Sequence, residues 1–191
     1  MEEDFYIVGI GASAGGLIAL KEFFDHIPAG TPAAFIVVTH LNREKHSILS
    51  ELLAAHTPLP IARVDKDVKI ESENIYVLTE NTTLTIENNW LKVSARDDKI
   101  INSSVDIFFK SLATQFKERA IGIILSGGGN DGLQGALQLA KSGGKVMVQN
   151  LVTAQVSGMP ASIIDHDHPS DILNPRKLAE KVIQLCRAGT E

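Results

Sequence analysis

Apolar residues in this chain form short continuous runs that alternate with segments of helical spacing. The runs at 5–10, 34–39, 120–125 and 145–149 lack polar alternation, which is typical of parallel strands covered on both faces. Between them, the spacing predicts helices at 17–27, 48–56, 105–116 and 133–140, and a final one from 175 onward. This order predicts an α/β fold with a doubly wound, mostly parallel sheet and helices on both faces, in three layers.

The middle of the chain has a different pattern. Residues 61–64 predict a third, shorter strand of the sheet, and 74–78, 83–86 and 91–95 predict further short strands. Asn88 and Asn89 fit a tight hairpin turn, so we interpret this segment as a small antiparallel hairpin excursion at one edge of the sheet. Neither a repeat nor a low-complexity linker interrupts the sequence, and residues 1–191 are expected to form a single domain.

The first strand runs into a glycine-rich turn and then into a helix. Three interpretations compete for this turn. The spacing Gly9-x-Gly11-x-x-Ala14 fits a dinucleotide fingerprint, in which glycines let a pyrophosphate approach a helix N-terminus. The spacing Gly11-x-Ser13-x-Gly15 fits a nucleophile elbow, in which a sharp turn projects a serine. The third interpretation is a strand-to-helix turn that carries no chemistry.

Composition narrows the classes of function. The 191 residues carry a net charge of −5 and no basic stripe, which argues against nucleic-acid binding. The chain starts with acidic residues rather than the positive region of a secretory signal, and no apolar run is long enough to span a bilayer. Cys186 is the only cysteine, so the sequence offers neither a disulfide framework nor a thiolate metal cage. We therefore expect a cytoplasmic protein without direct membrane insertion.

Candidate chemistry follows three of the predicted strands. In doubly wound sheets the functional groups lie in the loops beyond the carboxyl ends of the strands, where Ser13, His40 and Asp131 stand in this chain. They are a nucleophile, a base and an acid, and we expect His40 Nε2 to face Ser13 and His40 Nδ1–H to face Asp131. A dinucleotide site would instead want an acidic residue where this chain has Thr39 and His40. A serine hydrolase without cofactor or metal is therefore favoured.

Short motifs over nearly the whole chain add a family resemblance. They are the serine turn at 10–16, Thr39-His40-Leu41, Ser104-Val105-Asp106, the glycine-rich turn at 125–132, Gln149-Asn150 and Gly158-Met159-Pro160. Together they resemble the catalytic domain of the bacterial chemotaxis protein-glutamate methylesterases, the CheB-type family. The resemblance is closest to methylesterase modules found in fusions with methyltransferase and sensory domains, and we expect no receiver domain before the first strand.

The resemblance implies an enzyme that hydrolyses γ-glutamyl methyl esters on chemoreceptors, often with deamidation of glutamines, within bacterial two-component signal transduction. It implies Ser13 as nucleophile, His40 as general base and Asp131 as the acid that orients it. The oxyanion of such a reaction needs aimed donors, for which we expect the backbone N–H groups of Ala14 and Gly128. The resemblance alone suggests a substrate pocket that includes Asn102, Ser103 and Asn130. The expected partner is a methylated chemoreceptor or a related signalling protein.

The chain departs from the family pattern at three positions near these motifs. Ala14 stands where threonine is usual, Gly128 where methionine is usual, and Thr39 where glutamine is usual. The departures at Ala14 and Gly128 keep a second function open, a catalytically weak module that uses the same fold to bind a receptor or regulatory partner.

Two further groups of polar residues have more than one interpretation. Asp106 fits a charge at a helix N-terminus as well as it fits a catalytic acid. The run Asp165-His166-Asp167-His168 could hold a metal, but we favour a solvated loop before Pro169. His26, His46 and His56 fit helix ends or the surface.

Overall fold

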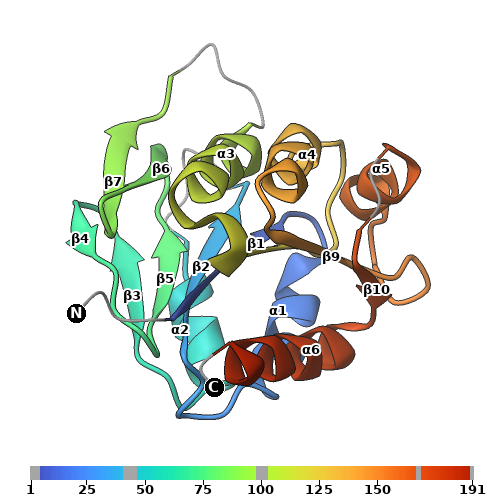
Figure 1. The fold of residues 1–191 in the computed structure, drawn as a ribbon, viewed down its shortest axis with the longest axis horizontal. Coiled ribbons are helices and arrows are strands. Elements are labelled where there is room, and N and C mark those ends of the chain that lie inside the picture. Colours follow the sequence, from blue (N-terminus) through green and yellow to red (C-terminus); the bar gives the residue numbers. More distant parts are fainter. Residues whose placement is uncertain (1–4, 41–46, 98–102, 167–168, 190–191) are drawn as a thin grey trace.

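The computed structural model describes residues 5–40, 47–97, 103–166 and 169–189. A seven-stranded sheet in the order β10-β9-β8-β1-β2-β5-β3 forms the centre of the molecule, and its strand pairs are parallel (Figure 1). The strands of this sheet are β1 (Tyr6–Ala12), β2 (Ala33–Thr39), β3 (Ile61–Val64), β5 (Ile75–Leu78), β8 (Ala120–Ile124), β9 (Lys145–Gln149) and β10 (Asp171–Leu173). The predicted doubly wound fold is confirmed.

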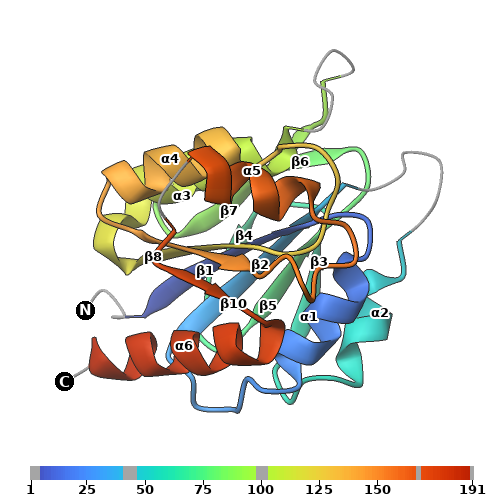
Figure 2. The same cartoon turned by 90° about the vertical axis from the view of Figure 1, so that its right-hand side faces the viewer.

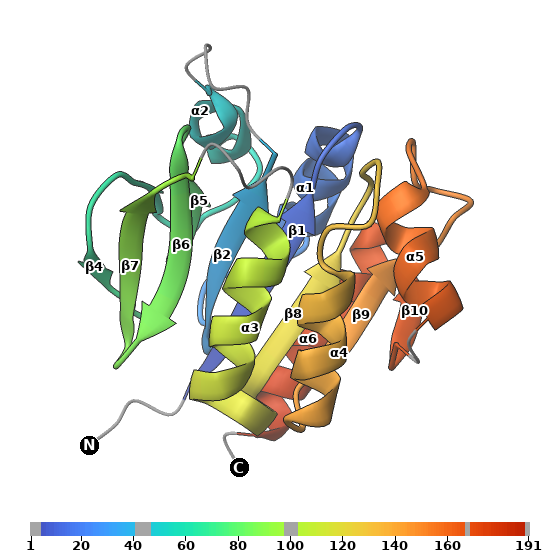
Figure 3. The same cartoon turned by 90° about the horizontal axis from the view of Figure 1, so that it is seen from above.

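Helices cover both faces of the sheet, which gives the three predicted layers (Figure 2). One face carries α3 (Ser104–Phe116), α4 (Leu133–Lys141) and α5 (Gly158–His166), and the other carries α1 (Gly16–Phe24), α2 (Leu49–Ala54) and α6 (Pro175–Ala188). A 3₁₀ turn, η1 (Lys117–Arg119), joins α3 to β8. Seen from above, α3 and α4 run side by side over the sheet (Figure 3).

The central strands are apolar throughout because successive side chains enter two different cores. In β1, Ile7 packs with the core under α3 and α4, whereas Val8 and Ile10 pack with the core over α1 and α6. In β2, Ile36 packs with the core under α3 and α4, and Phe35 packs with the core over α1 and α6. Polar residues therefore appear only where the strands end, and this is where the candidate chemistry lies.

A second, three-stranded antiparallel sheet packs beside α3 in the order β4-β7-β6 (Figure 3). Its strands are β4 (Val68–Lys69), β6 (Thr82–Glu87) and β7 (Trp90–Ala95). Asn88 and Asn89 form the hairpin turn with φ values of 50° and 62°, the left-handed conformation that a two-residue turn of this kind requires. The hairpin at these asparagines is confirmed.

The sequence prediction was wrong for residues 74–78. They form β5, which is parallel to β2 and β3 and lies between them in the main sheet, not in the antiparallel excursion. All four residues of β5 are buried, as a strand with helices and a second sheet on its two faces requires. This strand resembles part of the hairpin in sequence because it is short and close to the hairpin in the chain.

Some elements were missed or misplaced at their ends. The sequence pattern did not predict β4, β10 or α5, and α2 is shorter at Leu49–Ala54 than the expected 48–56. The helix α5 starts at a glycine and has Pro160 in its first turn, so it lacks the usual apolar spacing. The strands β4 and β10 have two and three residues, too few for a periodic pattern.

The topology reverses at β1. From β1 the chain adds β2 on one side, and after the excursion it returns to place β8 on the other side. The carboxyl ends of β8, β1 and β2 are therefore neighbours, and the loops that follow them meet at the crevice where doubly wound sheets bind ligands. None of the described helices is long and apolar enough to cross a membrane.

Candidate active site

Ser13 is the first residue after β1 and stands in a tight turn before α1. Its N–H donates to the carbonyl of Ser126 at 2.9 Å, and its own carbonyl accepts from Gly16 N–H at 2.9 Å. Gly15 has a φ of 74°, and a Cβ at Gly16 would lie 2.7 Å from the Cβ of Ala12. The glycines of this turn are thus needed for its geometry, which holds Ser13 at the N-terminus of α1 as a nucleophile elbow would.

His40 follows β2 and links Ser13 to Asp131. Its Nδ1 lies 3.1 Å from Ser13 Oγ, and its Nε2 lies 2.6 Å from Asp131 Oδ2. The side chains of His40 and Asp131 are 12% and 1% exposed, so the pair is shielded from water. The structure therefore brings the three predicted residues together in one chain of hydrogen bonds.

The expected orientation of the imidazole was wrong: Nδ1, not Nε2, faces the serine. Ser13 follows the strand next to β2, so it meets the ring nitrogen that lies closer to the backbone. Asp131 follows β8, one strand further away, and is reached by the distal Nε2. The chemistry is unchanged, since a carboxylate that accepts Nε2–H leaves the Nδ1 lone pair to accept a proton from Ser13.

Asp131 is buried at the N-terminus of α3. Its Oδ2 accepts from Val105 N–H at 3.0 Å, in addition to His40, and its Oδ1 accepts from Asp106 N–H at 2.9 Å. Unpaired N–H groups and the positive end of the helix dipole favour an anionic carboxylate at this place. The helix α3 thus holds the carboxylate in position against His40.

Asp106 has a structural part in the same region. Its Oδ1 accepts from Gly132 N–H at 3.1 Å and from Gly135 N–H at 2.7 Å, at the start of α4. Burial raises the pKa of the Asp106 carboxyl; the hydrogen bond from Gly135 opposes this, and the charge of Asp131 adds to it. Asp106 thus lies in the first turn of α3, as its interpretation as a helix N-terminal residue expects. The N–H groups that its carboxyl accepts belong to the start of the neighbouring helix, α4.

Ala14 directly follows the nucleophile, and Gly128 lies in the loop after β8. Among the described residues, neither backbone N–H donates to an acceptor. The loop before Gly128 is held by hydrogen bonds from Gly127 N–H to Val156 O at 2.9 Å and from Met159 N–H to Gly127 O at 2.8 Å. Gly128 does not have a left-handed φ, and a Cβ there would meet only Val156 Cγ1, at 3.9 Å. Their expected part in binding an oxyanion stays a prediction.

Ser126 is a buried residue that was not predicted to have a part in the site, and it forms several hydrogen bonds near Ala14. Its Oγ lies 2.8 Å from Ala14 O and 3.2 Å from Val156 O, and it accepts from Val156 N–H at 2.9 Å. Its backbone N–H donates to Gln149 Oε1 at 2.9 Å. Ser126 is fully buried and ties together the loops after β1, β8 and β9. The motif that contains it was the available signal.

The resemblance-based pocket residues have mixed outcomes. Asn102 lies outside the described residues. Ser103 is the N-cap residue of α3, next to the N–H groups that bind Asp131, and Asn130 is an exposed residue directly before Asp131. Their part in substrate binding stays a prediction.

An open pocket of about 240 Å³ adjoins Ser13 and His40 on the side of α1 and α2. Aliphatic side chains of the two helices line it, among them Leu17, Leu49 and Leu52. This pocket was not predicted, because apolar residues at helical spacing have the same pattern whether they face a core or a cavity.

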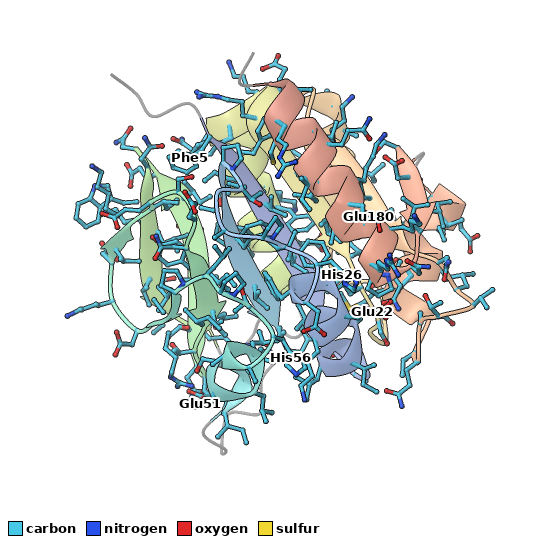
Figure 4. All side chains as sticks on the ribbon, turned by 90° about the horizontal axis from the view of Figure 1, so that it is seen from below. Phe5, Glu22, His26, Glu51, His56 and Glu180 are labelled. Atoms are coloured by element: carbon cyan, nitrogen blue, oxygen red, sulfur yellow. The ribbon has the colours of Figure 1, made fainter. Side chains whose placement is uncertain are left out.

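Other candidate groups lie outside this arrangement. His26 Nδ1 lies 2.7 Å from Glu22 O and His56 Nδ1 lies 2.9 Å from Asp25 Oδ1, on the side of α1 and α2 (Figure 4). His166 belongs to α5 and contacts Ser162 O at 3.0 Å, so the predicted loop does not include Asp165 and His166. His46, Asp167 and His168 lie outside the described residues, and the described ones contain no cluster of three or more metal-ligating side chains.

Cys186 is not an alternative nucleophile. It is fully buried in α6, and burial raises the pKa of its thiol from 9.0 to about 12.

Comparison with known proteins identifies the family. The family model described as CheB methylesterase matches residues 8–182. The chain belongs to the CheB methylesterase family. It also resembles the crystal structure of the Thermotoga maritima CheB methylesterase catalytic domain, with a TM-score of 0.87 and 27% identity over 95% of this chain and 99% of that one.

Two curated relatives differ in length. A protein-glutamate methylesterase/protein-glutamine glutaminase 2 from Cupriavidus metallidurans is 30% identical over 96% of this chain, which spans 55% of that protein. A putative protein-glutamate methylesterase/protein-glutamine glutaminase from Leptospira interrogans is 27% identical over 98% of both proteins. The chain thus spans about half the length of the first relative and nearly all of the second.

Proposed function

We propose that this chain is a carboxylic ester hydrolase that removes methyl groups from γ-glutamyl methyl esters on chemoreceptors. The observation that carries the proposal is the hydrogen-bonded series from Ser13 Oγ through His40 to the buried Asp131, at 3.1 and 2.6 Å, in a member of the CheB methylesterase family. The names of the relatives extend the proposal to the deamidation of glutamine side chains. The partner is a methylated chemoreceptor or a related signalling protein.

The proposed reaction begins when Ser13 Oγ attacks the ester carbonyl carbon and His40 Nδ1 takes the hydroxyl proton. Asp131 accepts the Nε2–H bond and stabilises the imidazolium that forms. The N–H groups of Ala14 and Gly128 bind the oxyanion, and one such donor contributes about 2.7–4 kcal/mol to the transition state. The C–OCH₃ bond then breaks, and the proton on Nδ1 passes to the departing methanol.

Water completes the cycle. His40 Nδ1 takes a proton from the water, whose oxygen attacks the glutamyl-serine ester. Collapse of the second tetrahedral intermediate breaks the bond to Ser13 Oγ, returns the proton to that oxygen and releases the glutamyl carboxylic acid, which ionises. With a glutamine substrate, ammonia leaves in place of methanol. These steps require no cofactor.

The proposal is tested by methanol release from a peptide that contains a γ-glutamyl methyl ester, together with labelling by a serine-directed fluorophosphonate. We expect Ser13→Ala and His40→Ala each to lower kcat/KM by more than about 10³-fold, and Asp131→Asn to leave more activity, because triad members act as a unit in which the acid is least costly to lose. Ser142→Ala, at the far end of α4, is the matched control and should keep wild-type turnover and labelling.

Two outcomes would contradict the proposal. Turnover by Ser13→Ala at the wild-type rate would mean that another nucleophile acts. A wild-type chain that releases no methanol but binds the methylated peptide would instead indicate an interaction module.

A further inference from the structure

The pocket beside Ser13 and His40 is larger than a methyl ester requires. Its volume is about 240 Å³, whereas one water molecule occupies about 30 Å³ of liquid. Leu17 and Leu20 of α1 form one wall, and Leu49 and Leu52 of α2 form another. Such walls bind alkyl groups, and neither a methoxy group nor ammonia would fill the space between them.

The proposed mechanism determines which part of a substrate enters this space. The leaving oxygen must lie within hydrogen-bonding reach of His40 Nδ1, since this nitrogen returns the proton to it. In the same mechanism the oxyanion binds to the N–H groups of Ala14 and Gly128 and does not need this pocket. The pocket is lined by both Ser13 and His40, so a group carried on the leaving oxygen has direct access to it.

We propose that this pocket is an alcohol subsite, and that the chain hydrolyses glutamyl esters of linear aliphatic alcohols up to n-butanol in addition to methyl esters. This inference rests on the proposed function. Ser13 Oγ forms a bond to the acyl carbon, the bond from that carbon to the alkoxy oxygen breaks, and the alcohol leaves with the proton from His40. Water then releases the acid as in the methyl ester reaction.

The size of the effect follows from burial of the alkyl chain. Each methylene moved from water into an apolar site is worth about 0.8 kcal/mol, which is about a fourfold increase in kcat/KM. We expect this increase for each step from methyl to n-butyl, and a plateau or decline once the pocket is full.

The experiment measures kcat/KM for N-acetyl-glutamyl γ-esters from methyl to n-hexyl, each normalised to its rate of hydroxide hydrolysis to remove intrinsic reactivity. Leu52→Phe and Leu49→Phe fill the pocket from α2, where both leucines are half-buried, and each should lower the butyl-to-methyl ratio at least tenfold. Leu137→Phe makes the same replacement on the exposed face of α4, and should keep the wild-type ratio. Circular dichroism and fluorophosphonate labelling verify that each variant is folded. If one of the two pocket variants does not fold, Leu17→Phe is used in its place, because Leu17 lines the same pocket.

The outcomes separate this inference from the proposed function. The alcohol subsite is overturned if the methyl ester is hydrolysed but the normalised kcat/KM falls as the alkyl chain grows. It is also overturned if the two pocket variants leave the butyl-to-methyl ratio of kcat/KM unchanged. Either result leaves the methylesterase proposal intact. If the pocket variants slow a methylated receptor peptide but keep the alkyl profile, the pocket holds an apolar side chain of the protein substrate and the inference is wrong. Absence of turnover for every ester overturns the proposed function itself.

Discussion

Thr39, the residue before His40, carries a buried hydroxyl that has no partner in the described part of the chain. The residue is 8% exposed, and its Oγ1 has no hydrogen-bond acceptor or donor among the described residues. A buried polar group left unpaired costs about 1–3 kcal/mol of stability. Another buried threonine, Thr31 before the start of β2, differs in this respect, because its hydroxyl donates to Pro28 O at 2.8 Å.

Removal of the Thr39 hydroxyl and removal of the Thr31 hydroxyl should therefore change the free energy of unfolding in opposite directions. We expect Thr39→Val to raise the free energy of unfolding by about 1 kcal/mol, since valine keeps the shape and suits a strand. Thr31→Val, the matched control, should lower it by about 1–2 kcal/mol because Pro28 O loses its donor. Urea unfolding with unchanged m-values measures both. A Thr39→Val variant that is destabilised as much as Thr31→Val would mean that the Thr39 hydroxyl has a partner in solution.

Residue types near strand ends were sufficient to predict which side chains meet at the site. Ser13, His40 and Asp131 were found from their positions after apolar runs, since the carboxyl ends of neighbouring parallel strands share an edge. The orientation of the imidazole could not be found in this way. It depends on which strand separates each partner from β2, and strand order is a property of the whole sheet.

At the scale of elements, the N-termini of α3 and α4 are joined by two carboxylates, each of which accepts hydrogen bonds from the other helix. Asp131, just before α4, binds the first N–H groups of α3, and Asp106 in the first turn of α3 binds Gly132 and Gly135 of α4. Each helix thus satisfies N–H groups that would otherwise be unpaired. The exchange also places the two carboxyl groups close together, which adds to the effect of burial in raising the pKa of Asp106.

This arrangement gives stability a dependence on pH. The pKa of Asp106 is raised in the folded state by burial, so the folded protein holds this proton more tightly than the unfolded chain, whose Asp pKa is about 3.9. The stabilisation from this group is fully present below that value and is lost as pH rises through the folded pKa. Asp106→Asn keeps an oxygen for Gly132 and Gly135 but removes the charge that faces Asp131 and Lys110.

We therefore expect the free energy of unfolding of Asp106→Asn, relative to wild type, to increase between pH 4 and pH 7. Asp106→Ala is the control: it loses both hydrogen bonds and should be less stable than Asp106→Asn by about 0.5–2 kcal/mol. Guanidinium unfolding at a series of pH values measures the differences. A constant or shrinking difference between Asp106→Asn and wild type would show that the charge of Asp106 does not oppose folding.

Elements with strong periodicity were predictable, and elements fixed by their neighbours were not. The apolar positions of β1, β2, β8 and α3 repeat with the period of their structure, and each was predicted within a few residues. The strand β5 has the right composition, but its place between β2 and β3 is set by packing in the main sheet. The helix α5 is held by contacts of Met159 and Gly158 with the loop at 127–129, which local spacing does not reveal.

At the scale of the whole molecule, the two sheets share one core. Leu84 and Ile86 of β6 and Leu91 of β7 pack in the same cluster as Phe108 and Leu112 of α3. This cluster also includes residues of β1 and β2, whose other faces enter the second core. The antiparallel sheet is thus coupled through α3 to the parallel sheet, and through it to α1 and α6.

This coupling predicts that the chain unfolds as one domain. Trp90, the only tryptophan, lies on β7 and is 42% exposed, so its fluorescence reports the antiparallel sheet, whereas circular dichroism at 222 nm reports the helices. We expect both signals to change in one transition. Leu91→Ala in β7 and Leu20→Ala in α1 should each lower the free energy of unfolding by about 2–5 kcal/mol and shift both signals equally, although the two leucines belong to different cores.

A separate transition of Trp90 fluorescence would contradict this, above all if Leu91→Ala shifted it and left the circular dichroism midpoint unchanged. The antiparallel sheet would then be an independent unit, and α3 would be stable without it. Because α3 carries the N–H groups that hold Asp131, the same experiment shows whether the position of the acid depends on a sheet that contributes no residue to the hydrogen-bonded series. If unfolding is one transition, destabilisation of β7 reaches the site only through global unfolding, and the fluorophosphonate labelling of Ser13 should decline at the same urea concentration as both spectroscopic signals.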